Sequence, residues 1–89
     1  MRELYTTAPF KKDLKRASRR GKDPKKLQQI IGTLVANEPL EKRNRPHDLS
    51  GYWSDCRECH IEPDWLLIWR EDEGSVTLMR TGTHADLFG

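Results

Sequence analysis

The sequence has no long hydrophobic run. None of its apolar stretches approaches the roughly 18 residues that a membrane-spanning helix needs. Its first twelve residues, MRELYTTAPFKK, also lack the apolar segment of a signal peptide. We therefore expect a cytoplasmic protein without a membrane partner, and at 89 residues a single domain, 1–89, with one thin core.

Cysteine is scarce, with Cys56 and Cys59 only, and both should stay reduced in the cytoplasm. With His60 they match C-x-x-C-H, the c-type haem attachment pattern. Haem attachment of this kind needs export, and a strand here would point the two thiols to opposite faces. Zinc bound by Cys59 or Cys56 together with His47, His60 and His84 stays an alternative, although no second close-spaced ligand pair is present. We predict no metal and no cofactor.

Basic residues are scarce in the second half of the chain and dense in the first. Residues 1–45 hold 13 Lys and Arg against 5 Asp and Glu, whereas residues 46–89 hold 3 against 9. Clustered positive charge is typical of proteins that bind polyanions such as nucleic acids. A solvated helix face that only aids solubility is the alternative, because charge runs alone are weak signals.

Two amphipathic helices are expected in the basic half. Thr7 is a candidate cap for a helix that starts near Pro9 and ends at Gly21, and Asp23 caps a second helix with Pro24 in its first position. The apolar stripe of the first helix follows helical spacing: Phe10, Leu14 and Ala17. The buried face of the second helix is longer: Leu27, Ile30, Ile31, Leu34 and Val35. The short link predicts a helical hairpin.

The remaining segments have the texture of strands. Residues 3–6 suggest an edge strand, residues 49–53 a strand or turn, and residues 57–61, 65–70 and 75–81 three further strands. Short turns between consecutive strands predict an antiparallel meander, with WLLIWR as its central strand. The expected fold class is α+β, with two N-terminal helices packed on one face of a twisted antiparallel sheet.

All three histidines, His47, His60 and His84, fall in the second half of the chain. Histidine is the side chain best suited to proton transfer near neutral pH. In the meander, the strand that leads to His84 returns toward Asp64, so one end or face of the sheet can gather these four residues. Such a set can supply a base and an acid for RNA transesterification without metal. Incidental surface or core histidines are the alternative.

Three segments of the second half carry a family resemblance. HDLSG at 47–51, CHIEPDWLLI at 59–68 and RTGTHADLFG at 80–89 resemble the YafQ branch of the RelE superfamily. Members of this branch are bacterial type II toxins that cut messenger RNA, largely on the ribosome. The helical half is similar in length, charge and layout. The resemblance implies a RelE-like fold and metal-independent cleavage that leaves a 2′,3′-cyclic phosphate or a 3′-phosphate and a 5′-hydroxyl.

The resemblance also implies roles for individual residues. His47 would be a candidate general base, with His60 left open as the other candidate, and His84 would be the general acid. His60 and Asp64, taken as a pair, would stabilise or shuttle charge at the scissile phosphate. Phe88 would hold or stack a nucleotide base, with a core-sealing tail as the alternative.

Further expectations concern charge and partners. Glu58 matches an acidic family position, and Arg80 is a candidate phosphate contact, with a sheet-face ion pair as the alternative. Ribosomal RNA docking is assigned to four basic residues of the first helix: Lys11, Lys12, Arg16 and Arg19. Expected partners are messenger RNA, the 70S ribosome and a neutralising antitoxin that binds operator DNA in complex with the toxin. A non-catalytic RNA-binding module and a zinc-binding regulator are the alternative functions.

Overall fold

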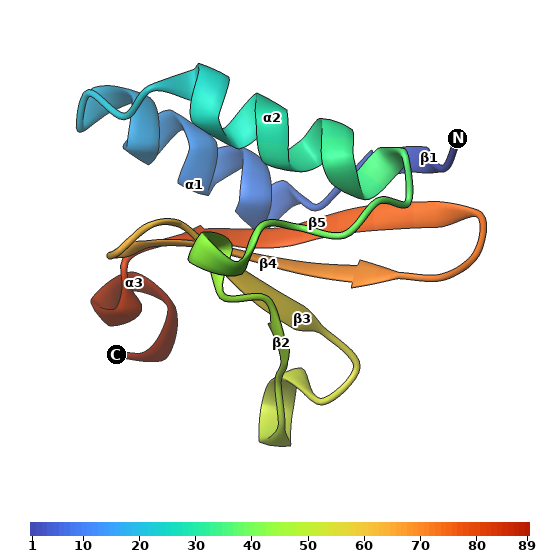
Figure 1. Ribbon diagram of the computed structural model, residues 1–89. Coiled ribbons are helices and arrows are strands. Elements are labelled where there is room, and N and C mark those ends of the chain that lie inside the picture. Colours follow the sequence, from blue (N-terminus) through green and yellow to red (C-terminus); the bar gives the residue numbers. More distant parts are fainter.

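The computed structural model describes residues 1–89 as two helices on one face of a five-stranded sheet, with a third, short helix on the other side (Figure 1). The strands are β1 (Glu3–Thr6), β2 (His47–Asp48), β3 (Arg57–Glu62), β4 (Trp65–Glu71) and β5 (Ser75–Gly82). The helices are α1 (Ala8–Arg19), α2 (Pro24–Val35) and α3 (His84–Phe88), with 3-10 turns η1 (Lys42–Asn44) and η2 (Gly51–Trp53). No helix has the length and apolar character to cross a bilayer.

The predicted helix boundaries are confirmed. The Thr7 side chain accepts a hydrogen bond from the backbone N–H of Phe10, and Asp23 accepts one from the N–H of Lys25. These caps satisfy backbone donors that the first helical turn leaves free. Gly21 follows the end of α1 with φ 76°, a left-handed conformation that glycine adopts without steric cost.

The sheet has the strand order β1-β5-β4-β3-β2. The predicted meander is confirmed, because β2, β3, β4 and β5 pair antiparallel in sequence order, with β4 in the centre. The all-antiparallel prediction fails at one edge, where β1 pairs parallel with β5. The chain leaves β1 through two helices and three strands before β5 forms, and a crossover of this length permits parallel pairing.

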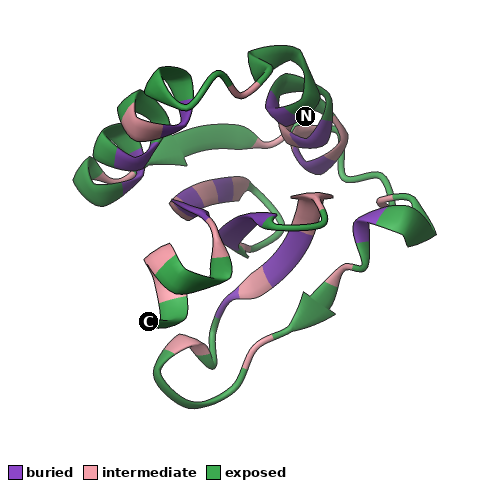
Figure 2. Ribbon diagram, turned by 90° about the vertical axis from the view of Figure 1, so that its left-hand side faces the viewer, coloured by how far each residue is buried: buried purple, intermediate pink, exposed green.

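The main core lies between the sheet and the helices α1 and α2. Trp65, Leu67 and Trp69 alternate along β4 toward the helices, where they join Phe10 and Leu27. Figure 2 shows buried segments on the central strands and on both long helices, whereas α3 carries only half-buried and exposed residues. On the opposite face, Leu66 and Ile68 of β4 are also buried, and α3 packs against β5.

The apolar stripe predicted for α1 is wrong at one position. Leu14 is 40% exposed, whereas Asp13 is only 4% exposed and lies between the buried Phe10 and Ala17. Helical spacing allows residue i+3 or i+4 to follow Phe10 on the buried face. The carboxylate takes that place because it accepts hydrogen bonds from the guanidinium groups of Arg16 and Arg80 and from the backbone N–H of Thr81.

Candidate functional site

Two histidines and a phenylalanine meet on the sheet face that is turned away from α1 and α2. His60 pairs with Leu66 across the ladder, and both side chains point away from the helix-side core of Leu67. A bulge between His60 and Glu62 shifts the register beside this residue. The ring centroids of His60 and His84 are 5.7 Å apart, and those of His84 and Phe88 are 6.4 Å apart.

Asp64 holds His84 rather than His60. Its Oδ1 accepts hydrogen bonds from the His84 backbone N–H at 3.0 Å and from the His84 Nδ1 at 2.9 Å. These two donors hold the pKa of Asp64 below its usual range. The expected pairing of His60 with Asp64 is therefore wrong. His84 is the first residue of α3. Its backbone N–H is therefore not used within the helix and bonds to the Asp64 carboxylate.

The Nδ1 atoms of the other two histidines meet backbone carbonyl groups. His60 Nδ1 lies 3.0 Å from the carbonyl oxygen of Pro63, and His47 Nδ1 lies 2.9 Å from that of Arg45. A carbonyl oxygen only accepts hydrogen bonds, so Nδ1 carries the proton in both rings. His60, and His84 with its Nδ1 on Asp64, thus present Nε2 as the nitrogen available for further chemistry.

His47 is engaged at both ring nitrogens. Its Nε2 lies 3.3 Å from Oε1 of Glu58, its direct neighbour across the β2–β3 ladder. Glu58 is only 4% exposed, and its Oε2 has no hydrogen-bond partner. Both ring nitrogens of His47 therefore face an acceptor atom of the protein. His47 lies beside this buried carboxyl group, one diagonal step along the sheet from His60.

The helix that carries His84 and Phe88 is anchored by Asp86. Its carboxylate and the Thr83 hydroxyl form a capping box, and Arg20 of α1 binds the same carboxylate at 2.6 and 3.2 Å. The Arg20 hydrogen bonds and the Thr83 backbone N–H hold the pKa of Asp86 well below its usual range. Gly82 allows this approach, since a Cβ there would lie 2.8 Å from Asp86 Oδ2.

The Asp86 charge should make stability depend on pH. A carboxyl whose pKa is lower in the folded than in the unfolded state stabilises the fold above its unfolded value and loses that contribution as pH falls. We expect Asp86→Asn to lower the free energy of unfolding at pH 7, and the gap to wild type to shrink below about pH 4. Urea unfolding of both proteins between pH 7 and pH 2 measures this difference in the free energy of unfolding. Glu73→Gln, an exposed control without an ion pair, should show no gap, and a pH-independent gap for Asp86→Asn would contradict the prediction.

Two of the expected RNA contacts are engaged within the protein. The Arg80 guanidinium binds Asp13 at 2.5 and 3.1 Å, which matches the alternative of a structural ion pair. Arg16 binds Asp13 at 2.9 Å and lies 3.7 Å from Asp86. The other three residues of the predicted docking set are exposed and form no ion pair: Lys11, Lys12 and Arg19.

The cysteines lie inside the protein. Cys56 and Cys59 are free and buried, and burial raises the pKa of Cys56 to about 11 and that of Cys59 to about 12. A thiol with so high a pKa is a poor nucleophile at neutral pH. No group of three or more His, Cys, Asp or Glu residues is arranged to hold a metal ion.

Sequence reasoning missed three residues that shape the site. Arg45 and Pro63 act through backbone carbonyls, which no side-chain pattern reveals. Arg20 lies 66 positions from Asp86 and carries no local signal for that contact. The spacing of Thr83 and Asp86 does resemble a capping box and could have predicted α3.

Comparison with known proteins identifies relatives of the whole chain. The model of the family described as a bacterial toxin of type II toxin–antitoxin systems, YafQ, matches residues 2–89. The mRNA interferase toxin YafQ of Escherichia coli K12 is 39% identical over 89 residues, covering 99% of this chain and 97% of that protein.

Solved structures of YafQ and of related toxins are similar to this protein over the whole chain. A chain of the E. coli DinJ–YafQ toxin–antitoxin complex superposes with a TM-score of 0.92 at 39% identity, covering 99% of this chain and 98% of that one. A metal-bound toxin from Helicobacter pylori gives a TM-score of 0.92 at 38% identity, covering 99% of this chain and 100% of that one. The RelE-like α+β architecture and the motif resemblance therefore agree, and the chain belongs to the YafQ family of bacterial type II toxins.

Proposed function

We propose that this protein is an endoribonuclease that cleaves messenger RNA by acid–base catalysis at His60 and His84. The observation that carries the proposal is the pair of imidazole rings 5.7 Å apart, half-buried His60 held by a carbonyl group and exposed His84 held by the Asp64 carboxylate. Titratable side chains that meet in one place, each held in a fixed orientation, are candidates for the acid and the base of a catalytic site. The name of the E. coli relative, an mRNA interferase, supports the substrate class.

The reaction needs one proton removed and one supplied. The base takes the proton of the RNA 2′-hydroxyl, whose oxygen attacks phosphorus. The bond from phosphorus to the 5′-oxygen breaks, and the acid gives that oxygen a proton. The products are a 2′,3′-cyclic phosphate and a 5′-hydroxyl. Each of the two proton transfers typically contributes about 10²–10⁴-fold to the rate.

His84 suits the acid and His60 suits the base. The Asp64 carboxylate accepts the Nδ1 proton of His84 and so stabilises an imidazolium that can donate a second proton from Nε2. The partner of His60 is an uncharged carbonyl oxygen, which leaves the neutral ring with a free lone pair on Nε2. The ring nitrogens of His47 both face acceptors of the protein, the Arg45 carbonyl oxygen and Glu58, so His47 is less available than His60 to take the proton.

Phe88 and the basic helix face complete the proposal. The Phe88 ring is 48% exposed and adjoins His84, which suits stacking against a nucleotide base. The exposed cations of α1, namely Lys11, Lys12 and Arg19, offer a surface for ribosomal RNA and its phosphates. Cleavage on the 70S ribosome in the cytoplasm would then inhibit translation.

A cognate antitoxin is the expected protein partner. YafQ of E. coli is found in a complex with DinJ, a toxin–antitoxin complex. At this level of similarity over the whole chain, a small antitoxin that neutralises this protein, and binds operator DNA together with it, follows as part of the proposal.

The assignment of the base can be tested by separating His60 from His47. His60→Ala is expected to lower kcat by about 10²–10⁴-fold and to remove the acid limb of the pH–rate profile, because the base acts unprotonated. His47→Ala should lower kcat less and keep that limb. Single-turnover cleavage of messenger RNA on programmed ribosomes, between pH 5 and pH 9, measures both. Loss of the limb in His47→Ala alone would make His47 the base.

A chelator controls for metal in the same assay. The H. pylori relative is metal-bound, so the zinc-binding alternative deserves a direct measurement. Protein treated with EDTA and then dialysed free of the chelator should cleave at the same rate as untreated protein, with mapped fragments that end in a cyclic phosphate. Stoichiometric zinc in the purified protein together with intact RNA would favour the metal-binding regulator.

A further inference from the structure

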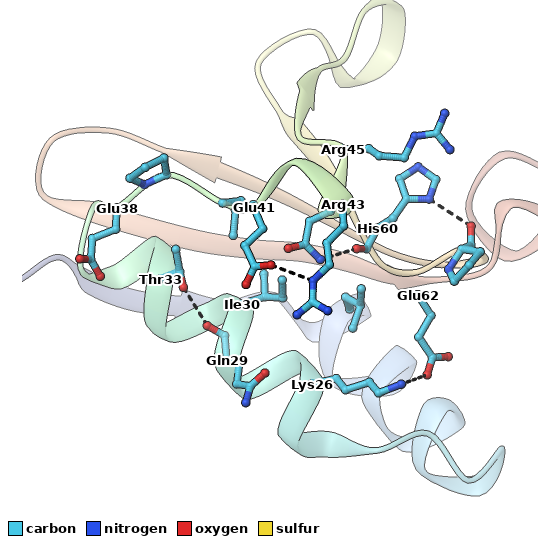
Figure 3. Close-up of a pocket in the computed structure, with 15 residues that line it drawn as sticks. Lys26, Gln29, Ile30, Thr33, Glu38, Glu41, Arg43, Arg45, His60 and Glu62 are labelled. Atoms are coloured by element: carbon cyan, nitrogen blue, oxygen red, sulfur yellow. Dashed lines mark hydrogen bonds and ion pairs between the residues drawn. The ribbon is translucent and has the colours of Figure 1, made fainter.

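A groove of about 850 Å³ opens beside His60, between α2 and the chain that leads into β2 (Figure 3). Its walls come from α2, from residues 38–45 and from the end of β3. Ile30, Leu40 and Ile61 provide apolar surface. Its volume is within the range of pockets that enclose small ligands, so it can take a nucleotide next to the catalytic histidines.

The groove wall carries three cations, Lys26, Arg43 and Arg45, and three carboxylates, Glu38, Glu41 and Glu62. Lys26 binds Glu62 at 2.8 Å, and Arg43 binds Glu41 at 2.9 Å. Arg45 forms no ion pair, and in Figure 3 its guanidinium lies at the His60 end of the groove, on the side away from α2. Arg45 is therefore the cation of the groove that is free to bind an anion from solution.

The backbone of Arg45 is tied to the site as well. It adopts the left-handed conformation at φ 50° and ψ 51°, where it ends η1. Residues with a Cβ atom adopt this conformation at a steric cost, and such positions often occur at functional sites. The Arg45 carbonyl oxygen bonds to His47 Nδ1, so one residue orients a histidine with its backbone and places a cation with its side chain.

We propose that this groove binds the RNA strand next to the scissile bond and that the Arg45 guanidinium contacts a phosphate of that strand. The inference rests on the proposed nuclease function and deepens it. A planar guanidinium matches two phosphate oxygens. Arg80, the sequence-based candidate for a phosphate contact, is bound to Asp13 and is less available. The Asn44 amide bonds to the His60 carbonyl oxygen at 2.8 Å and joins the groove wall to the catalytic strand.

Arg45→Gly removes the guanidinium and keeps the carbonyl, because glycine adopts the left-handed conformation freely. Combined with His84→Ala to keep RNA intact, it should weaken binding of a fluorescent single-stranded oligoribonucleotide roughly 10-fold, as expected for a charge-assisted hydrogen bond. The slope of log affinity against log salt should fall by about 0.7, the value for one phosphate of a single strand. Arg45→Lys should restore the slope and part of the affinity.

Two variants serve as controls. Arg70→Gln removes an exposed arginine bound to Asp55, and Asn37→Gly places glycine at another left-handed position, φ 57°. Both should leave affinity and slope unchanged.

Unchanged affinity and slope in Arg45→Gly would overturn the inference, as would a variant that binds RNA normally but resists its antitoxin, since a protein would then occupy the groove. Because this assay measures RNA binding and not cleavage, its result tests the role of Arg45 separately from the proposed nuclease function. Cleavage that persists in His84→Ala alone would count against the catalytic assignment only.

Discussion

Replacement of His84 by alanine is expected to lower the rate of messenger RNA cleavage by about 10²–10⁴-fold, the usual contribution of a general acid. The side chain is exposed and its Nε2 is free, so the loss should fall on the 5′-oxygen leaving step. Alanine keeps the backbone N–H that bonds to Asp64, and α3 should stay in place. Single-turnover cleavage on programmed ribosomes gives the rate, and primer extension after induction in bacteria gives the cut sites.

Asp64→Asn tests the contribution of the carboxylate that binds His84. It keeps the shape of the contact and removes the charge that supports the imidazolium, so its rate should lie between those of wild type and His84→Ala. Tyr52→Ala, which removes a ring that is 89% exposed on η2, is the control without an expected effect. Equal growth arrest by wild type and His84→Ala would refute the role of His84 as the acid.

Asp13→Ala is expected to cause the largest loss of stability among the charged residues. Asp13 accepts hydrogen bonds from Arg16, Arg80 and the Thr81 backbone, and its removal leaves these donors unpaired. Loss of one partner of a buried pair costs about 3–5 kcal/mol, and because Arg80 is partly exposed to water we expect about 2–3 kcal/mol. A domain of this size has only about 5–15 kcal/mol in total.

Urea unfolding of Asp13→Ala against wild type measures this loss. Lys12→Ala, which removes an exposed side chain from the adjacent position of the same helix, should change the free energy of unfolding by less than about 0.5 kcal/mol. A change of similar size in both variants would show that the Asp13 network contributes little. The cavity left by the aspartate is small, so the effect reports on its hydrogen bonds.

Local chemistry explains which parts of the fold could be predicted from the sequence. Thr7 and Asp23 cap their helices through contacts two or three residues away, and the apolar run from Trp65 to Trp69 has to be central because water cannot reach it on either face. The parallel pairing of β1 depends on how the whole chain closes. Leu14 was predicted at the buried position of α1 because the partners that make burial of Asp13 favourable, Arg80 and Thr81, lie far along the chain in β5.

In the candidate site, too, the residue types could be predicted from the sequence, whereas one of the contacts could not. The three histidines and Asp64 are visible as residue types, and the meander correctly brings Asp64 to His84. The partner of His60, however, is a backbone carbonyl whose position depends on the turn at Pro63. Residue spacing therefore predicts which side chains form such a site. It does not predict which ring nitrogen of each histidine carries the proton.

The three Nδ1 contacts have a consequence for regulation. Each ring is already oriented by groups of the protein itself, two of them backbone carbonyls, before an RNA strand binds. A partner that covers the Nε2 atoms of His60 and His84 would restrain such a toxin without disturbing these contacts. Its departure would then leave the rings oriented as they are here.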